Sequence, residues 1–64
     1  MEKMYLVEWG QVKPFNSIRI VCEESDAVKV ALAIFRGNHR DKFPACLILT
    51  DMTTGKGQVL LDCM

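Results

Sequence analysis

The sequence predicts an α+β fold, in which a four-stranded antiparallel sheet carries one helix packed on one face. Four short apolar segments, separated by turn-forming residues, predict the strands. One segment between the second and third strands has apolar residues at helical spacing, which predicts the helix. The order is therefore ββαββ, and a chain of 64 residues is expected to form a single small globular domain, residues 1–64.

The first two strands are predicted at Met4–Trp9 and Ser17–Cys22. The second is rich in Ile and Val, which favour strands. Residues 10–16 contain Gly, Pro and Asn, which are typical of a loop. These two segments are therefore expected to be consecutive strands joined by a loop.

The helix is predicted from Asp26 to about Arg36. Ser25 can cap its first turn, and Gly37 is a natural stop. Its apolar residues fill roughly 200° of the helical wheel, wider than the stripe of about 100° that most surface helices bury. Ala27 and Ala31 lie near the middle of this arc and allow close approach to a sheet. We expect the helix side of the core to consist of Val28, Ala31, Ile34 and Phe35.

The last two strands are predicted at Ala45–Thr50 and Gln58–Cys63, joined by a Gly-containing hairpin loop. The helix returns the chain to the far end of the sheet, so the third strand runs parallel to the second. Placing the third strand beside the first makes every neighbouring pair antiparallel, in the order 2-1-3-4. A right-handed connection then keeps the helix on one face.

The strands are apolar on both faces. Residues 45–49 and 59–61 show no polar alternation, although successive strand side chains point to opposite faces. One helix can cover only one side of such a sheet. The sequence therefore predicts a homo-oligomer, most simply a twofold dimer, formed by the helix-free face or by joined sheet edges.

The composition and net charge of the chain argue against several classes of function. Half of the residues are hydrophobic, which indicates a globular chain, and the formal net charge is zero. A neutral chain is not expected to be an acidic DNA mimic or to bind nucleic acid by bulk charge. Three cysteines without close spacing predict reduced thiols in a reducing compartment. With no apolar signal segment at the start, the expected location is the cytoplasm.

No motif predicts catalysis, a cofactor or a metal. The residues Cys22, His39, Cys46 and Cys63 fit no paired-ligand spacing for zinc. A Cys–His nucleophile pair would lack an orienting acid. Residues 54–57 lack the leading Gly and the following Ser or Thr of a phosphate loop. We therefore expect no cofactor and no enzymatic activity.

The predicted topology gathers basic residues at one end of the sheet. The candidate partner-binding residues are Arg36, His39, Arg40, Lys42, Lys13 and Trp9. The basic residues could bind nucleic-acid phosphate or an acidic protein surface, or they could only complement the helix dipole and solvate loops. Trp9 would mark an interface if exposed and would fill the core otherwise. If these residues do not bind the partner, we expect the binding surface on the open sheet face, around Tyr5, Val7, Ile48 and Leu60.

These observations favour a small non-enzymatic interaction protein that acts by binding a macromolecular partner, with a protein as the first candidate. Size and compactness suggest a phage or mobile-element inhibitor of host machinery, of the anti-CRISPR or another anti-defence type. The alternative is a small nucleic-acid-binding module using the basic loop 36–42. A third hypothesis is a subunit of an oligomeric enzyme with a composite site. No membrane partner is expected.

Overall fold

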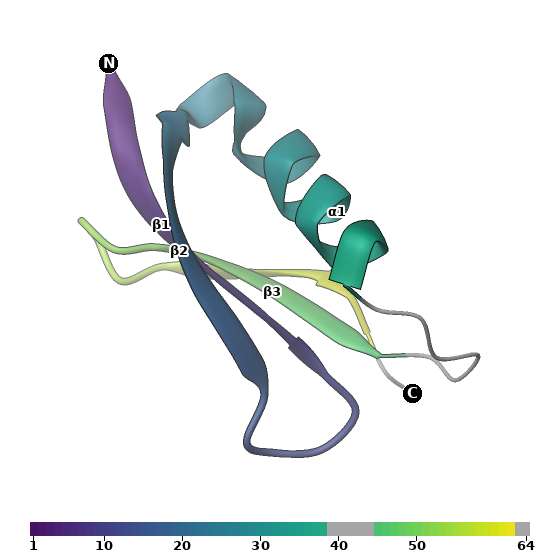
Figure 1. The fold of residues 1–64 in the computed structure, drawn as a ribbon. Coiled ribbons are helices and arrows are strands. Elements are labelled where there is room, and N and C mark those ends of the chain that lie inside the picture. The colour runs from purple at the N-terminus through teal and green to yellow at the C-terminus, as the bar shows by residue number, and fades with distance from the viewer. Residues whose placement is uncertain (39–44, 63–64) are drawn as a thin grey trace.

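A computed structural model describes residues 1–38 and 45–62 and shows two layers, a sheet and a helix that lies across it (Figure 1). The sheet is antiparallel with four strands in the order β2-β1-β3-β4, which confirms the predicted fold class and strand order. The strands are β1 (Glu2–Gly10), β2 (Asn16–Glu23), β3 (Cys46–Asp51) and β4 (Gly57–Leu61).

The core lies between the helix and the two central strands. Tyr5, Val7 and Trp9 alternate along β1 and are all buried, as are Leu47 and Leu49 of β3. Register explains this arrangement, because Val7 stands opposite Leu49 and Trp9 stands opposite Leu47. The odd-numbered residues of the two central strands therefore point toward the helix.

The helix begins later than predicted. A short 3₁₀ turn, Glu24–Asp26, leads into α1 (Ala27–Asn38). Ser25 lies inside this 3₁₀ turn, and the residue at the cap position, Glu23, makes no side-chain capping hydrogen bond. At the other end α1 continues past Gly37, and Asn38 Nδ2 donates to the Ile34 carbonyl at 2.7 Å. The side chain of Asn38 thus folds back onto the last turn of the helix.

The helix contacts the sheet through its small residues. Ala27 and Ala31 are buried, and Ile34 and Phe35 are partly buried against the core. Val28 is 40% exposed, so its predicted place in the core is wrong. Adjacent helical residues are separated by about 100°, so Val28 lies to one side when Ala27 and Ala31 face the sheet.

The β3–β4 hairpin is closed by its own backbone. The Asp51 amide donates to the Lys56 carbonyl at 2.9 Å, and the Gly55 amide donates to the Asp51 carbonyl at 2.7 Å. Gly55 has a φ of +78°, a left-handed conformation that glycine adopts at no steric cost. Asp51 Oδ1 also accepts a hydrogen bond from the Thr53 amide at 2.8 Å. The hairpin therefore fixes Asp51 at the end of β3.

Candidate functional site

The second face of the sheet is not covered by any element in residues 1–38 and 45–62, because α1 lies on the opposite side (Figure 1). Its apolar side chains alternate with the buried ones along the strands. Met4, Val21 and Val59 are 45%, 58% and 60% exposed. Leu6 and Ile48 are half-buried. We call the surface formed by Met4, Leu6, Val21, Ile48 and Val59 the open face.

Strand pairing makes the open face continuous across all four strands. Met4 of β1 stands opposite Val21 of β2, and Ile48 of β3 stands opposite Val59 of β4. Leu6 lies between these pairs on the central strand β1. Large contiguous apolar patches are uncommon on monomeric soluble proteins and mark interaction sites. The open face is therefore the strongest candidate for a binding surface.

Two opposite charges, Glu8 and Arg19, lie near the centre of this sheet face, whereas the paired residues Glu2 and Glu23 lie at its end. Arg19 of β2 stands opposite Leu6, and Glu8 lies two residues further along β1, opposite Ile48. Within the described part of the chain, neither side chain forms an ion pair or a side-chain hydrogen bond. Both charges are thus available to a molecule that docks on the open face.

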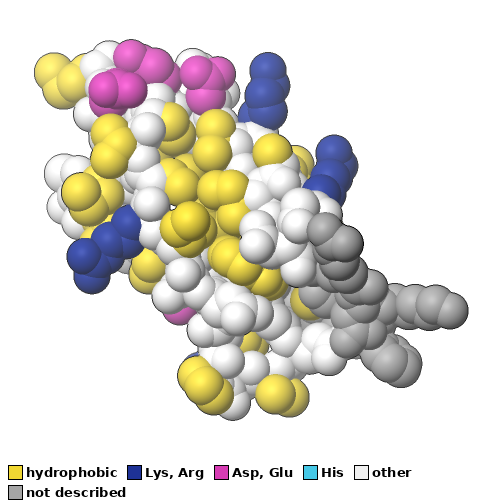
Figure 2. Space-filling view, in the orientation of Figure 1, with side chains coloured by type: hydrophobic (Ala, Val, Ile, Leu, Met, Phe, Trp, Pro, Cys, Tyr) yellow, Lys and Arg dark blue, Asp and Glu magenta, His cyan; other side chains and the backbone are white. Residues whose placement is uncertain are grey.

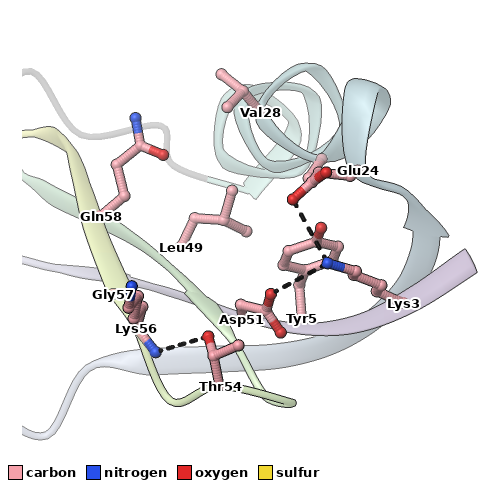
Figure 3. Close-up of a pocket in the computed structure, with 11 residues that line it drawn as sticks. Lys3, Tyr5, Glu24, Val28, Leu49, Asp51, Thr54, Lys56, Gly57 and Gln58 are labelled. Atoms are coloured by element: carbon pink, nitrogen blue, oxygen red, sulfur yellow. Dashed lines mark hydrogen bonds and ion pairs between the residues drawn. The ribbon is translucent and has the colours of Figure 1, made fainter.

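A second candidate is a cavity of about 370 Å³ between the start of the helix and the β3–β4 hairpin (Figure 3). Lys3 Nζ lies 3.5 Å from Glu24 Oε1 and 3.7 Å from Asp51 Oδ2. Leu49 and Val28 contribute apolar side chains to the lining. The charged groups of this cavity are therefore largely engaged with one another.

Tyr5 lines this cavity and has a buried hydroxyl group. Its side chain is buried, and its hydroxyl has no hydrogen-bond partner in the described residues. Burial raises the pKa of the Tyr5 hydroxyl, and the carboxylate of Glu24, followed by that of Asp51, raises the pKa of the Lys3 ammonium. Both groups stay protonated at neutral pH, so neither can serve as a general base there.

The cysteines offer little nucleophilic chemistry. Cys22 is free, and burial raises the pKa of its thiol, which keeps it in the less reactive protonated form. Cys46 is disulfide-bonded, so the prediction of reduced thiols is wrong at this residue. Strand pairing brings together residues distant in sequence, so wide cysteine spacing does not exclude a disulfide. The cysteines therefore do not indicate a reducing compartment. Cys63 lies outside the described residues.

Metal-ligating side chains do not cluster in the portion of the chain that is described. No group of three or more His, Cys, Asp or Glu residues there lies close enough to hold a metal ion. His39, one of the four residues considered for zinc, lies outside that portion. The described residues therefore offer no metal centre on which a function could be based.

Of the six sequence-predicted binding residues, the structure describes Arg36, Lys13 and Trp9. Arg36 lies in the last turn of α1 and Lys13 in the loop between β1 and β2, both exposed. Trp9 is only 8% exposed and belongs to the core. His39, Arg40 and Lys42 lie outside the described residues. Figure 2 shows acidic side chains gathered where β2 leads into the helix, with Lys and Arg side chains spread apart on the same view.

The expected composition of the open face also needs correction. Tyr5 and Val7 face the helix, and Leu60 packs against the core, so only Ile48 of the expected set lies on the open face. A sequence signal for this orientation exists in β1, because Trp9 and Tyr5 share one parity and Glu8 has the other. Placing the large aromatic residues inward puts Met4, Leu6 and Glu8 outward.

Comparisons of the chain with protein families, with curated proteins and with solved structures found no match. Among the described residues, α1 is too short and insufficiently apolar to cross a membrane. We therefore infer the function of this chain from its surface chemistry.

Proposed function

We propose that this chain is a small non-enzymatic interaction protein, which acts by binding a macromolecular partner and uses its open face to bind protein. The observation that supports this function is the exposure of Met4, Val21 and Val59 on an uncovered sheet face. Removing such apolar surface from water is the main favourable term in most protein–protein association. The open face thus has the composition of the centre of a protein interface.

A protein fits this surface better than a nucleic acid does. Nucleic-acid binding depends on several cations that contact phosphates and on aromatic side chains that stack on bases. The open face carries one cation, Arg19, offset by Glu8, and its strands place Tyr5 and Trp9 on the opposite side. The formal net charge of the chain is also zero.

Among interaction proteins, we propose the class of phage or mobile-element inhibitors of host machinery, of the anti-CRISPR or another anti-defence type. The support for this class is the small size and compact α+β fold of a chain whose most distinctive feature is a binding surface. An inhibitor of this kind acts by occupying a surface of its target, which requires no catalytic group. The cytoplasm is where such an inhibitor would meet host machinery.

The test compares two lysine substitutions. Val21→Lys places a charge on the open face, on an edge strand where lysine is well tolerated. Val12→Lys makes the same change in the β1–β2 loop, at a residue that is 77% exposed. The tagged proteins are used to capture partners from lysate of the cell that encodes the chain, or of the host if the chain is viral. Captures are made with and without nuclease.

We expect the wild type and Val12→Lys to retain a defined protein through nuclease treatment and Val21→Lys to lose it. Circular dichroism of each variant controls for folding. Equal capture by both variants would show that the open face is not the binding surface. Loss of capture on nuclease treatment would favour the nucleic-acid hypothesis.

A further inference from the structure

We propose that the protein which fits the open face is a second copy of this chain, packed face to face in a twofold dimer. This inference rests on the proposed function, since it takes the open face to be a protein-binding surface, and it names the occupant. A twofold interface brings the same patch of both copies together. The patch must therefore be complementary to itself in both shape and charge.

The charges of the open face meet this condition. Glu8 and Arg19 are opposite in sign, lie on neighbouring strands, and are unpaired among the described residues. A twofold operation that places Glu8 of one copy over Arg19 of the other also makes the reciprocal pair. Two ion pairs then form across the interface while no like charges face each other, which favours this partner over unrelated ones.

Register shows that one axis can satisfy the charges and the apolar residues together. Strands are about 4.8 Å apart and rise about 3.3 Å per residue. With these spacings, consider a twofold axis that lies between the two sheets and exchanges the positions of Glu8 and Arg19. This axis passes close to Leu6, which stands opposite Arg19 and lies two residues from Glu8 on the same strand. The same axis brings Ile48 of one copy near Val21 and Met4 of the other. The strands of the two sheets then cross steeply, as in orthogonal sheet packing.

The broad face of the molecule is large enough for such a dimer. The two longer dimensions of the chain are 36 Å and 21 Å, and a rectangle with these sides has an area of about 760 Å². A stable specific interface buries about 800 Å² on each partner. A dimer of the usual size must therefore use nearly the whole of this face. It leaves both helices on the outside, free to contact a third molecule.

The test uses charge exchange between copies. Glu8→Arg leaves two cations near the centre of the open face, and Arg19→Glu leaves two anions there. Each variant alone should self-associate at least about tenfold more weakly than the wild type, because like charges now meet across the axis. Mixed together, the two variants should form a heterodimer, since every cross-pair becomes complementary. Native mass spectrometry separates the species because the variants differ in mass.

Two further variants control this experiment. The double variant Glu8→Arg with Arg19→Glu should dimerise again, because the exchange restores both pairs. Lys29→Glu reverses a charge on an exposed helix residue away from the open face and should leave the dimer intact. Circular dichroism confirms that each variant is folded.

A wild type that stays monomeric across the micromolar range would overturn the dimer. So would a dimer whose affinity is unchanged in both single variants and in which mixing shows no preference for the heterodimer. In either case, loss of a captured protein in Val21→Lys would still support a protein-binding open face with a different occupant. If Val21→Lys also has no effect on capture, the proposed function fails as well.

Discussion

Tyr5 illustrates how one residue connects the core to the cavity at the helix start. Its ring lies in the core, while its hydroxyl is buried without a hydrogen-bond partner among the described residues. An unpaired buried hydroxyl costs free energy, because the group has lost its hydrogen bonds to water. The aromatic ring therefore accounts for the place of Tyr5 in the core, and we expect its hydroxyl to add no stability.

Tyr5→Phe tests this view of the hydroxyl. We expect the variant to be at least as stable as the wild type at neutral pH, since the substitution keeps the ring and removes the unpaired group. Denaturant unfolding measures the difference. A clear loss of stability in Tyr5→Phe would show that the hydroxyl has a favourable partner.

The pH dependence of stability follows from Lys3, Tyr5 and Cys22. The folded state raises the pKa of all three groups above their ordinary values of 10.5, 10.0 and 9.0. As pH rises, the unfolded chain therefore loses these protons first, and the free energy of unfolding decreases. The contributions are complete below about pH 9 and are lost as pH rises through the folded-state values.

We expect unfolding measurements between about pH 8 and pH 10.5 to show this decline and to show a shallower one in Tyr5→Phe. The variant lacks one of the three titrating groups, so fewer protons distinguish its folded and unfolded states. If the free energy of unfolding fell with pH at the same slope in the wild type and in Tyr5→Phe, Tyr5 would not contribute to the decline.

At the scale of elements, the helix packs on the sheet through Ala27 and Ala31. Both are buried, and their small side chains allow the helix backbone to approach β1 and β3 closely. Larger neighbours, Ile34 and Phe35, contribute from the flank and are only partly buried. The methyl side chains of Ala27 and Ala31 thus set the distance between the helix and the sheet.

Enlarging this contact should be costly. Ala31→Leu inserts three carbon atoms where no space exists and should destabilise the fold by about 1–3 kcal/mol. Ala33→Leu makes the same change at an exposed position of α1 and should alter stability by less than about 0.5 kcal/mol. Thermal or chemical unfolding compares the two. Similar values for both would mean that the helix does not rest on Ala31.

A second pair of variants tests which apolar residues form the core. Leu47 is completely buried, so Leu47→Ala should lower the free energy of unfolding by about 2–5 kcal/mol. Val28 is exposed, and alanine favours helix more than valine does, so Val28→Ala should cost less than about 1 kcal/mol. If Val28→Ala lowered the free energy of unfolding more than Leu47→Ala does, Val28 would face the core, which contradicts the described orientation of the helix.

These element-scale results show why the sequence predicted the topology but not the orientations. Turn residues and apolar segments mark the strands, and the helix crossover leaves one antiparallel order that pairs the first and third strands. Rotation of the helix was not determined, because its apolar arc is roughly 200° wide and several stripes could face the sheet. The prediction therefore included Val28 and omitted Ala27 from the core.

The same ambiguity affected the candidate site. β3 and β4 are apolar on both faces and carry no alternation to indicate which parity is buried. In β1 the shared parity of Tyr5 and Trp9 is the one available signal, and the prediction of Tyr5 and Val7 on the open side does not use it. The presence of a surplus apolar face was predictable, because it depends only on composition and on having one helix. The pairing that brings Met4 beside Val21 and Ile48 beside Val59 came from register, which the sequence pattern did not specify.

The molecule as a whole has two layers, a sheet and a helix, although the sheet has apolar side chains on both faces. Its composition would therefore allow a third layer on the open face. The helix covers one face of the sheet, and the open face presents Leu6, Val21 and Ile48. Glu8 and Arg19 lie on the same face and are unpaired among the described residues. A second copy supplies the missing layer and pairs both charges. We therefore expect the open face to be covered by protein in solution.

Paramagnetic relaxation of methyl groups by a soluble gadolinium chelate measures this cover directly. The methyls of Val21 and Ile48 should be shielded from the chelate at high protein concentration and become accessible on dilution. The methyls of Val12, in the β1–β2 loop, should remain accessible throughout. If the methyls of Val21 and Ile48 relax as strongly as those of Val12 at every concentration, the open face is bare in the isolated chain and the face-to-face dimer is contradicted.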